Sequence, residues 1–173
     1  MTARTDTFDL AGLRLTSGEG RRIELNVAIE PFALGTETYT VQPALIPALL
    51  QVSRTTADGF ALRLQFSAGL EGPCMRCLDP ATPSFTVDSR EVSQPGAGDE
   101  LDSPYVEDGT LDVGAWARDA LALALPAAVL CQPDCAGLCP DCGENLNTAG
   151  PEHHHDSGPD PRWAKLSELR FEE

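Results

Sequence analysis

The stretch 60-FALRLQF-66 carries an apolar side chain at every second position. Successive side chains of a β-strand point to opposite faces of the sheet, so this period of two predicts a half-buried strand. The stretch 23-IELNVAI-29 has the same period, and 84-SFTVDSREV-92 has a weaker form of it. Residues 38–55 predict one or two more strands, with Pro43 and Pro47 marking edges or bends, and 56-TADG-59 predicts a hairpin turn. We therefore expect residues 10–94 to form mainly β structure, as an antiparallel meander or a partly closed barrel.

The period changes downstream of an acidic segment rich in glycine and proline, residues 95–110, which predicts a flexible linker. In 111-LDVGAWARDALALALP-126 helical spacing predicts one amphipathic helix that ends at Pro126, and its inward apolar face is formed by Val113, Trp116, Ala117, Ala120, Leu121 and Ala124. Residues 131–147 form a cysteine-rich segment, and residues 162–171 predict a short C-terminal helix. The expected fold class is α+β, with residues 1–173 forming a single domain in which the helix packs on the sheet.

The net charge of −15 is unevenly distributed. Residues 91–161 contain fourteen acidic residues and one basic residue, Arg118, whereas eight arginines lie in residues 1–90. A phosphate backbone would be repelled by the acidic half, so direct contact with RNA is expected only through the N-terminal arginines. An acidic surface can keep a protein soluble, and it can also bind a basic protein partner.

The N-terminus has no apolar signal segment, and the longest apolar run, residues 120–130, is too short to cross a bilayer. We expect a cytoplasmic protein with no membrane association. Persistent disulfides are rare in that compartment, so the six cysteines are expected to bind metal or to carry out redox chemistry.

The cysteines offer two ligand sets for a zinc ion. The pairs 74-CMRC-77 and 139-CPDC-142 have the spacing at which one tight turn presents two thiolates, so Cys74, Cys77, Cys139 and Cys142 form the first set. The alternative is a local set on one loop, formed by Cys131, Cys135, Cys139 and Cys142. The sequence does not choose between these sets.

The histidines 153-HHH-155 add secondary candidates. Adjacent residues cannot all face one ion, so at most one or two of them can be ligands, with His153 and His155 as the candidate pair. Six cysteines favour a closed structural site, because catalytic zinc usually keeps one position open for water.

Two other roles for the cysteines are not favoured. A thioredoxin-like redox role would require 74-CMRC-77 at the start of a helix, and no helical pattern follows it. Cys135, Cys139 and Cys142 have a spacing similar to the cluster-binding signature of radical enzymes that use S-adenosylmethionine. Those enzymes need an α/β barrel, which this pattern of strands and one helix cannot build.

The order of 74-CMRCLDP-80, the acidic linker, the helix, 131-CQPDCAGLCPDCGENLN-147 and DPRWAKLSEL resembles the YceD family of bacterial proteins. The resemblance covers residues 25–169, and the histidine loop and DPRW tail look most like actinobacterial members. It implies a role in the synthesis, processing or stability of large-subunit ribosomal RNA, and it supplies no catalytic residue.

We expect a non-enzymatic ribosome-biogenesis factor with a structural zinc site, whose partner is a basic ribosomal protein or a pre-ribosomal particle. The alternatives are a metal-dependent RNA-processing enzyme and a zinc-ribbon protein that binds nucleic acid.

Overall fold

The computed structural model describes residues 3–56, 58–96, 98 and 101–155. The first half contains β1 (Thr7–Asp9), a 3₁₀ turn η1 (Ala11–Leu13), β2 (Gly20–Val27), β3 (Phe32–Leu34), β4 (Glu37–Gln42) and β5 (Ile46–Arg54). These elements are followed along the chain by β6 (Phe60–Pro73), β7 (Pro80–Ala81), β8 (Ser84–Ser93), β9 (Val106–Glu107), β10 (Thr110–Asp112) and α1 (Val113–Ala124). The predicted helix at 162–171 lies outside the described residues.

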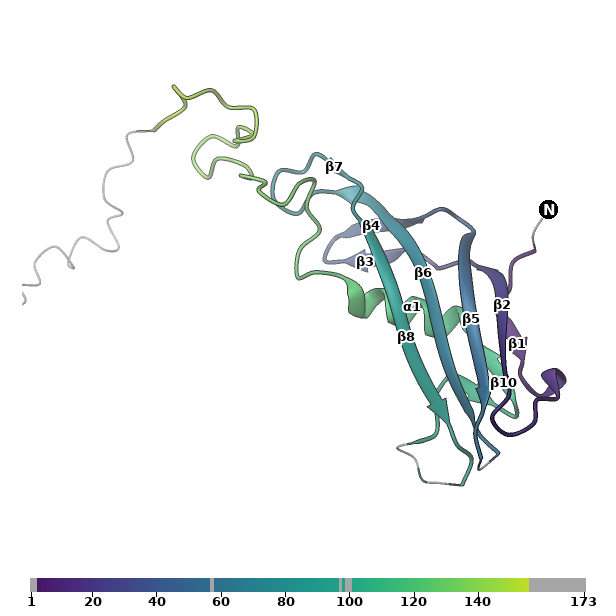
Figure 1. Cartoon of the computed structure of the whole chain (residues 1–173). Coiled ribbons are helices and arrows are strands. Elements are labelled where there is room, and N and C mark those ends of the chain that lie inside the picture. The colour runs from purple at the N-terminus through teal and green to yellow at the C-terminus, as the bar shows by residue number, and fades with distance from the viewer. Residues whose placement is uncertain (1–2, 57, 97, 99–100, 156–173) are drawn as a thin grey trace, which may run out of the picture.

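The long strand β6 organises an antiparallel sheet (Figure 1). One edge of β6 pairs with β5, which in turn pairs with β2. The other edge of β6 pairs with the whole length of β8. Beyond β5, the end of β6 pairs with β4, and β4 pairs with β3. Residues 43–45 separate β4 from β5, so the bend predicted at Pro43 is confirmed. Pro47 lies within β5, one residue before the ladder with β6 begins at Ala48.

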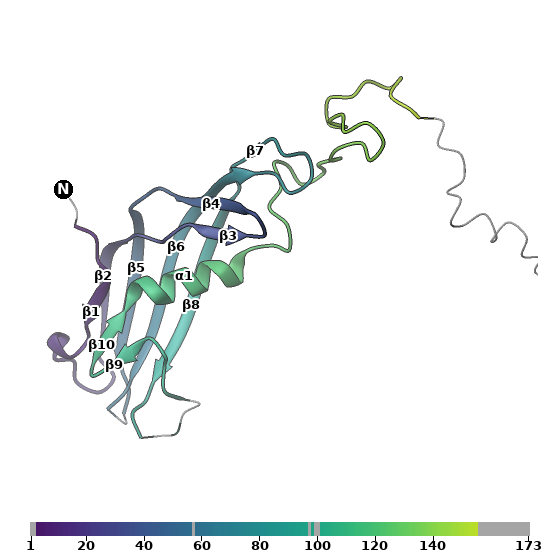
Figure 2. The same cartoon turned by 180° about the vertical axis from the view of Figure 1, so that it is seen from behind.

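The sheet is open, so the expected partly closed barrel is wrong. Among the described residues, β2 and β8 form opposite edges and do not pair with each other. The apolar face does not close on itself because other elements cover it. Figure 2 shows α1 lying across this face, with β1, β10 and β9 forming a small antiparallel sheet beside its beginning. The fold is therefore an α+β arrangement of an antiparallel sheet and one helix, as expected.

The alternation predicted from 60-FALRLQF-66 is confirmed and continues beyond it. The side chains at even positions of β6 from Phe60 to Leu70 are all buried, and those between them are exposed or half-buried. The strand β5 has the same pattern, with Ile46, Leu50 and Val52 fully enclosed. Burial of one face of each strand fixes the register of the sheet, because a slip of one residue would expose the entire apolar set.

Asp112 caps the N-terminus of α1, and its carboxylate accepts a hydrogen bond of 2.8 Å from the backbone N–H of Ala115. Such a cap satisfies a donor that the first helical turn leaves without a partner. The predicted inward face is buried, and Trp116 Nε1 donates to Ser89 Oγ on β8 at 2.9 Å. Ala124, also predicted inward, is exposed because the helix ends there. The helix ends at Ala124, two residues before the predicted end at Pro126.

The predicted linker at residues 95–110 contains regular structure near its end. The strand β9 lies within it, and β10 begins at its last residue and pairs with both β9 and β1. The side chain of Leu111 in β10 is fully buried, which ties this hairpin to the core. Among the described residues, no helix has the length and hydropathy needed to cross a membrane.

Candidate metal centre

Four cysteines meet at one end of the sheet. Cys74 and Cys77 lie on the turn between β6 and β7, and Cys131 and Cys135 lie on the segment that follows α1. Figure 1 shows this segment leaving the helix and passing the turn beside β7. The helix carries the chain back along the sheet, which brings two segments more than fifty residues apart into contact. We call these residues the four-cysteine group.

The sulfur atoms of the four-cysteine group are spaced as zinc ligands would be. All four Sγ atoms lie within 4.8 Å of one another, with Cys74 and Cys135 at 3.7 Å and Cys77 and Cys131 at 3.5 Å. A tetrahedral zinc ion with Zn–S bonds of about 2.3 Å separates its sulfur ligands by about 3.8 Å. A disulfide needs an S–S distance of about 2 Å, and all six cysteines are free. The group therefore suits a shared cation.

Local hydrogen bonds favour a thiolate at Cys74. Burial opposes ionisation of this thiol, but backbone N–H groups of Cys77, Arg76 and Cys131 outweigh it and lower the pKa of Cys74 to about 6. Burial, together with hydrogen bonds from the neighbouring cysteine side chains, raises the pKa of Cys77 to about 12. A bound divalent cation would favour the thiolate form of all four cysteines.

Several contacts fasten the two segments together. Met75 N–H donates to Val129 O at 2.9 Å, and Arg76 Nη1 donates to Cys135 O at 3.0 Å. Gly137 has φ +82° and passes close to Arg76, so that a Cβ atom added there would lie 3.3 Å from Arg76 O. This conformation and this close approach both favour glycine.

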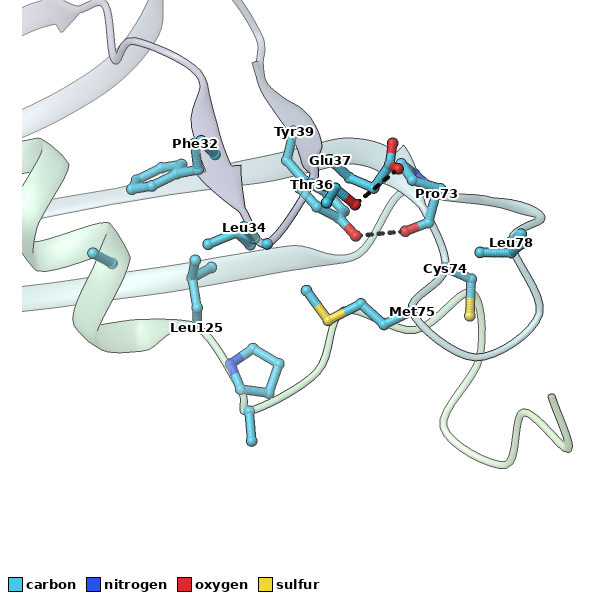
Figure 3. Close-up of a pocket in the computed structure, with 15 residues that line it drawn as sticks. Phe32, Leu34, Thr36, Glu37, Tyr39, Pro73, Cys74, Met75, Leu78 and Leu125 are labelled. Carbon is cyan, nitrogen blue, oxygen red and sulfur yellow. Dashed lines mark hydrogen bonds between the residues drawn. The ribbon is translucent and has the colours of Figure 1, made fainter.

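An apolar hollow lies beside the four-cysteine group (Figure 3). Phe32 and Leu34 line it from β3, Leu125 lines it from the end of α1, and the Met75 side chain extends into it from the cysteine turn. The Tyr39 hydroxyl donates to Pro73 O at 2.8 Å, immediately before Cys74. The position of the cysteine turn is thereby tied to β4 as well as to β6.

A second group of potential metal ligands lies further along the chain. It consists of Cys139, Cys142, His153 and His155, whose ligand atoms also lie within 4.8 Å of one another. Cys142 Sγ is 3.9 Å from His153 Nε2. The pKa of Cys139 is lowered to about 6, mainly by a hydrogen bond with the His153 side chain and next by hydrogen bonds from backbone N–H groups. We call these residues the cysteine–histidine group.

The two C-x-x-C turns have the same backbone hydrogen bonds. Leu78 N–H donates to Cys74 O at 3.0 Å, and Gly143 N–H donates to Cys139 O at 2.9 Å. The N–H of each first cysteine donates to the backbone carbonyl five residues ahead, Cys74 to Asp79 O at 2.7 Å and Cys139 to Glu144 O at 2.8 Å. Leu78 and Gly143, directly after each pair, both have positive φ, at 65° and 77°. Two separate segments thus adopt one ligand-presenting turn.

Asparagine and glutamate side chains support both groups. Asn147 Nδ2 donates to Cys135 Sγ at 3.4 Å, and Asn147 Oδ1 accepts from Ala136 N–H at 2.8 Å. Glu144 Oε2 lies 2.8 Å from His153 Nδ1. Partners of this kind orient metal ligands. The sequence alone indicates no role for these residues, although both lie in the quoted stretch 131–147, two and five residues after Cys142.

The structure divides the predicted ligands differently from either predicted set. It separates Cys74 and Cys77 from Cys139 and Cys142, and places them with Cys131 and Cys135 instead. The local set of four cysteines on one loop is divided in the same way. The reason is that the chain reaches the first turn directly after α1 and has moved past it by residue 139. His153 and His155 lie with Cys139 and Cys142, whereas His154 belongs to neither group.

Comparison with known proteins gives one family match and several sequence relatives. The model of the family described as large ribosomal RNA subunit accumulation protein YceD matches residues 62–170. Uncharacterized proteins of Mycobacterium tuberculosis and Mycobacterium bovis are each 34% identical over 173 residues, which covers 94% of this chain and 80% of theirs. An uncharacterized protein of Mycobacterium leprae is 45% identical over 65 residues, covering 38% of this chain and 29% of its own. No solved structure matches the chain.

Proposed function

Because the chain belongs to the YceD family, described as large ribosomal RNA subunit accumulation proteins, we propose that it supports the synthesis, processing or stability of large-subunit ribosomal RNA without catalysing a reaction. The family match is the observation that carries this proposal. It extends from β6 through both cysteine pairs, so it covers the candidate metal centre as well as the helix.

The four-cysteine group is proposed to hold one structural zinc ion. Three of its four side chains are buried, and the sulfur separations suit tetrahedral coordination. Four thiolate ligands leave no open position for water and make the ion a poor Lewis acid, which favours a structural role over catalysis. Zinc here would hold the turn after β6 against the segment after α1, and its binding free energy would add to the stability of this end of the fold.

We propose a basic ribosomal protein, alone or within a pre-ribosomal particle, as the partner in the cytoplasm. The acidic half of the chain presents exposed carboxylates at Asp102, Glu107, Asp108 and Asp134. Complementary charge favours encounter with a basic surface and disfavours contact with a bare phosphate backbone.

Binding measurements test the partner. Titration of the purified protein with basic large-subunit ribosomal proteins at moderate salt should reveal specific binding. The triple variant Asp102→Asn, Glu107→Gln and Asp108→Asn should weaken it, and Arg14→Gln serves as a control that changes charge outside the acidic half. Preferential, tight binding to naked ribosomal RNA would contradict the proposal.

Two further experiments test the cellular role and the absence of catalysis. Deletion of the gene should reduce large-subunit ribosomal RNA relative to small-subunit ribosomal RNA, and the intact gene should restore the ratio. Incubation of the pure protein with precursor ribosomal RNA should leave the RNA unchanged. Specific cleavage that Cys135→Ser abolishes without unfolding the sheet would instead establish a metal-dependent RNA-processing enzyme.

One observation favours a second candidate function, direct contact with RNA through the N-terminal half. On the outer face of the sheet, Arg22 pairs with Gln51, Gln51 with Arg63, and Arg63 with Arg90. Three arginines therefore lie in one row across four strands, although Arg63 also donates to Asp88 at 2.7 Å. If this row contacts phosphates, the double variant Arg22→Glu and Arg90→Glu should abolish RNA binding and leave the ribosomal-protein titration unchanged.

A further inference from the structure

We propose that the cysteine–histidine group binds a second zinc ion, separate from the one proposed for the four-cysteine group. This site would fold residues 136–155, which we call the tip, into a small metal-stabilised unit. The proposal does not depend on the ribosomal role, because it follows from the ligand arrangement alone.

The ligand atoms are already assembled. The four donors of this group lie within 4.8 Å of one another, and two sulfurs with two imidazole nitrogens are a common structural ligand set for zinc. His153 and His155 are two residues apart in a segment without helical structure. In extended chain, residues two apart lie on the same side, which lets both imidazoles face the cysteine pair. His154 lies between them, and its Nδ1 is 2.8 Å from Glu152 O.

A carboxylate orients one imidazole toward the cysteines. Glu144 Oε2 lies 2.8 Å from Nδ1 of His153, while Nε2 of the same ring lies 3.9 Å from Cys142 Sγ. A hydrogen bond at one ring nitrogen that leaves the other nitrogen facing the metal position is the usual arrangement at zinc-bound histidines. Glu144 lies two residues after Cys142. One short segment therefore carries both sulfur ligands and the carboxylate that orients a nitrogen ligand.

The tip has little else to hold its fold. Among residues 136–155, only Gly137 and Cys139 are buried. Twenty residues with so small a core do not offset the conformational entropy lost on folding. Segments of this kind usually depend on a metal or disulfides, and the cysteines here are free. The tip hairpin, closed by the bridge between Leu138 and Asn145, is therefore expected to need the ion.

The two sites should release metal at different rates. The four-cysteine group is enclosed between two segments and has three buried sulfurs, whereas Cys142 and His155 are exposed. A chelator can reach the cysteine–histidine group directly. We therefore expect chelation to remove zinc in two steps, with the ion of the tip leaving first.

The test measures zinc bound to the full chain, purified under reducing conditions and reloaded with zinc alone. The wild-type chain should hold two zinc ions and release them to a chromogenic chelator in two phases. The double variant His153→Ala and His155→Ala should hold one ion and lose the fast phase. His154→Ala is the matched control, because it removes the neighbouring imidazole, and it should hold two ions.

Substitution with Co²⁺ supplies an independent readout. The wild-type spectrum should contain bands of an all-sulfur site and of a mixed sulfur–nitrogen site, and the double variant should retain only the former. One ion per chain in wild type and double variant alike would overturn the second site and leave the four-cysteine site in place. Two ions in the double variant would also overturn it. A wild type that keeps only the mixed-ligand bands would overturn the four-cysteine site instead.

Discussion

Replacing Gly72 by alanine should destabilise the protein through the ring of Tyr39. A Cβ atom built at Gly72 would lie 2.7 Å from Cε1 and 3.0 Å from Cγ of that ring, and closer still to Cδ1. Carbon atoms normally approach to about 3.5–4.0 Å, so the ring would have to move by about 1 Å. The ring has little room to do so, because Tyr39 is 1% exposed and its hydroxyl is bonded to Pro73 O.

Gly69 in the same strand is the matched control. A Cβ atom there would lie 3.5 Å from its nearest neighbour, Pro83 O, which is an ordinary contact. Neither glycine has a positive φ, so alanine fits the backbone at both positions. Overpacking should cost Gly72→Ala about 1–3 kcal/mol of unfolding free energy. Gly69→Ala should gain about 0.4–1 kcal/mol, because alanine restricts the unfolded chain.

Urea denaturation of both variants, saturated with zinc, measures this difference. A loss of 2 kcal/mol corresponds to a midpoint lower by about 1 M when the denaturant slope is about 2 kcal/mol per M. The double variant Tyr39→Ala and Gly72→Ala should lose less unfolding free energy than the two single variants lose together. The reason is that the clash with the ring is absent from the double variant. If Gly72→Ala proved as stable as Gly69→Ala, the close packing of Tyr39 on β6 would be refuted.

Three other changes have defined outcomes. Trp116→Phe should lower the unfolding free energy by about 1–3 kcal/mol in the same urea assay, because Ser89 Oγ loses its donor and the smaller ring leaves a cavity; an unchanged midpoint would contradict the bond. Asp112→Ala should cost about 1 kcal/mol through loss of the helix cap, whereas Asp112→Asn should retain most of the stability. Cys135→Ser should remove one zinc per chain and expose residues 127–135 to faster amide exchange while β5 and β6 remain protected; an unaltered zinc content would exclude this residue as a ligand.

Local patterns in the sequence predicted the secondary structure around the site. The period of two at 60–66 predicted a strand, and the side chains facing the core from it are buried as expected. Helical spacing predicted α1 and its buried Trp116. These features are predictable because strand and helix periodicity depend on near neighbours in the chain. The hairpin of β9 and β10 was missed, because its strands are short and rich in acidic residues, and their pairing depends on the distant strand β1.

The residue types and their spacing by themselves determined that this protein has cysteine pairs on tight turns, an antiparallel sheet and one covering helix. Tertiary structure alone decided that the sheet stays open and which cysteines share a site. The physical reason is distance along the chain: Cys74 and Cys135 meet only because α1 crosses the sheet and returns residues 128–135 to the end of β6. A further few residues carry Cys139 and Cys142 out of reach of that turn and toward the histidines, so one cysteine-rich stretch serves two groups.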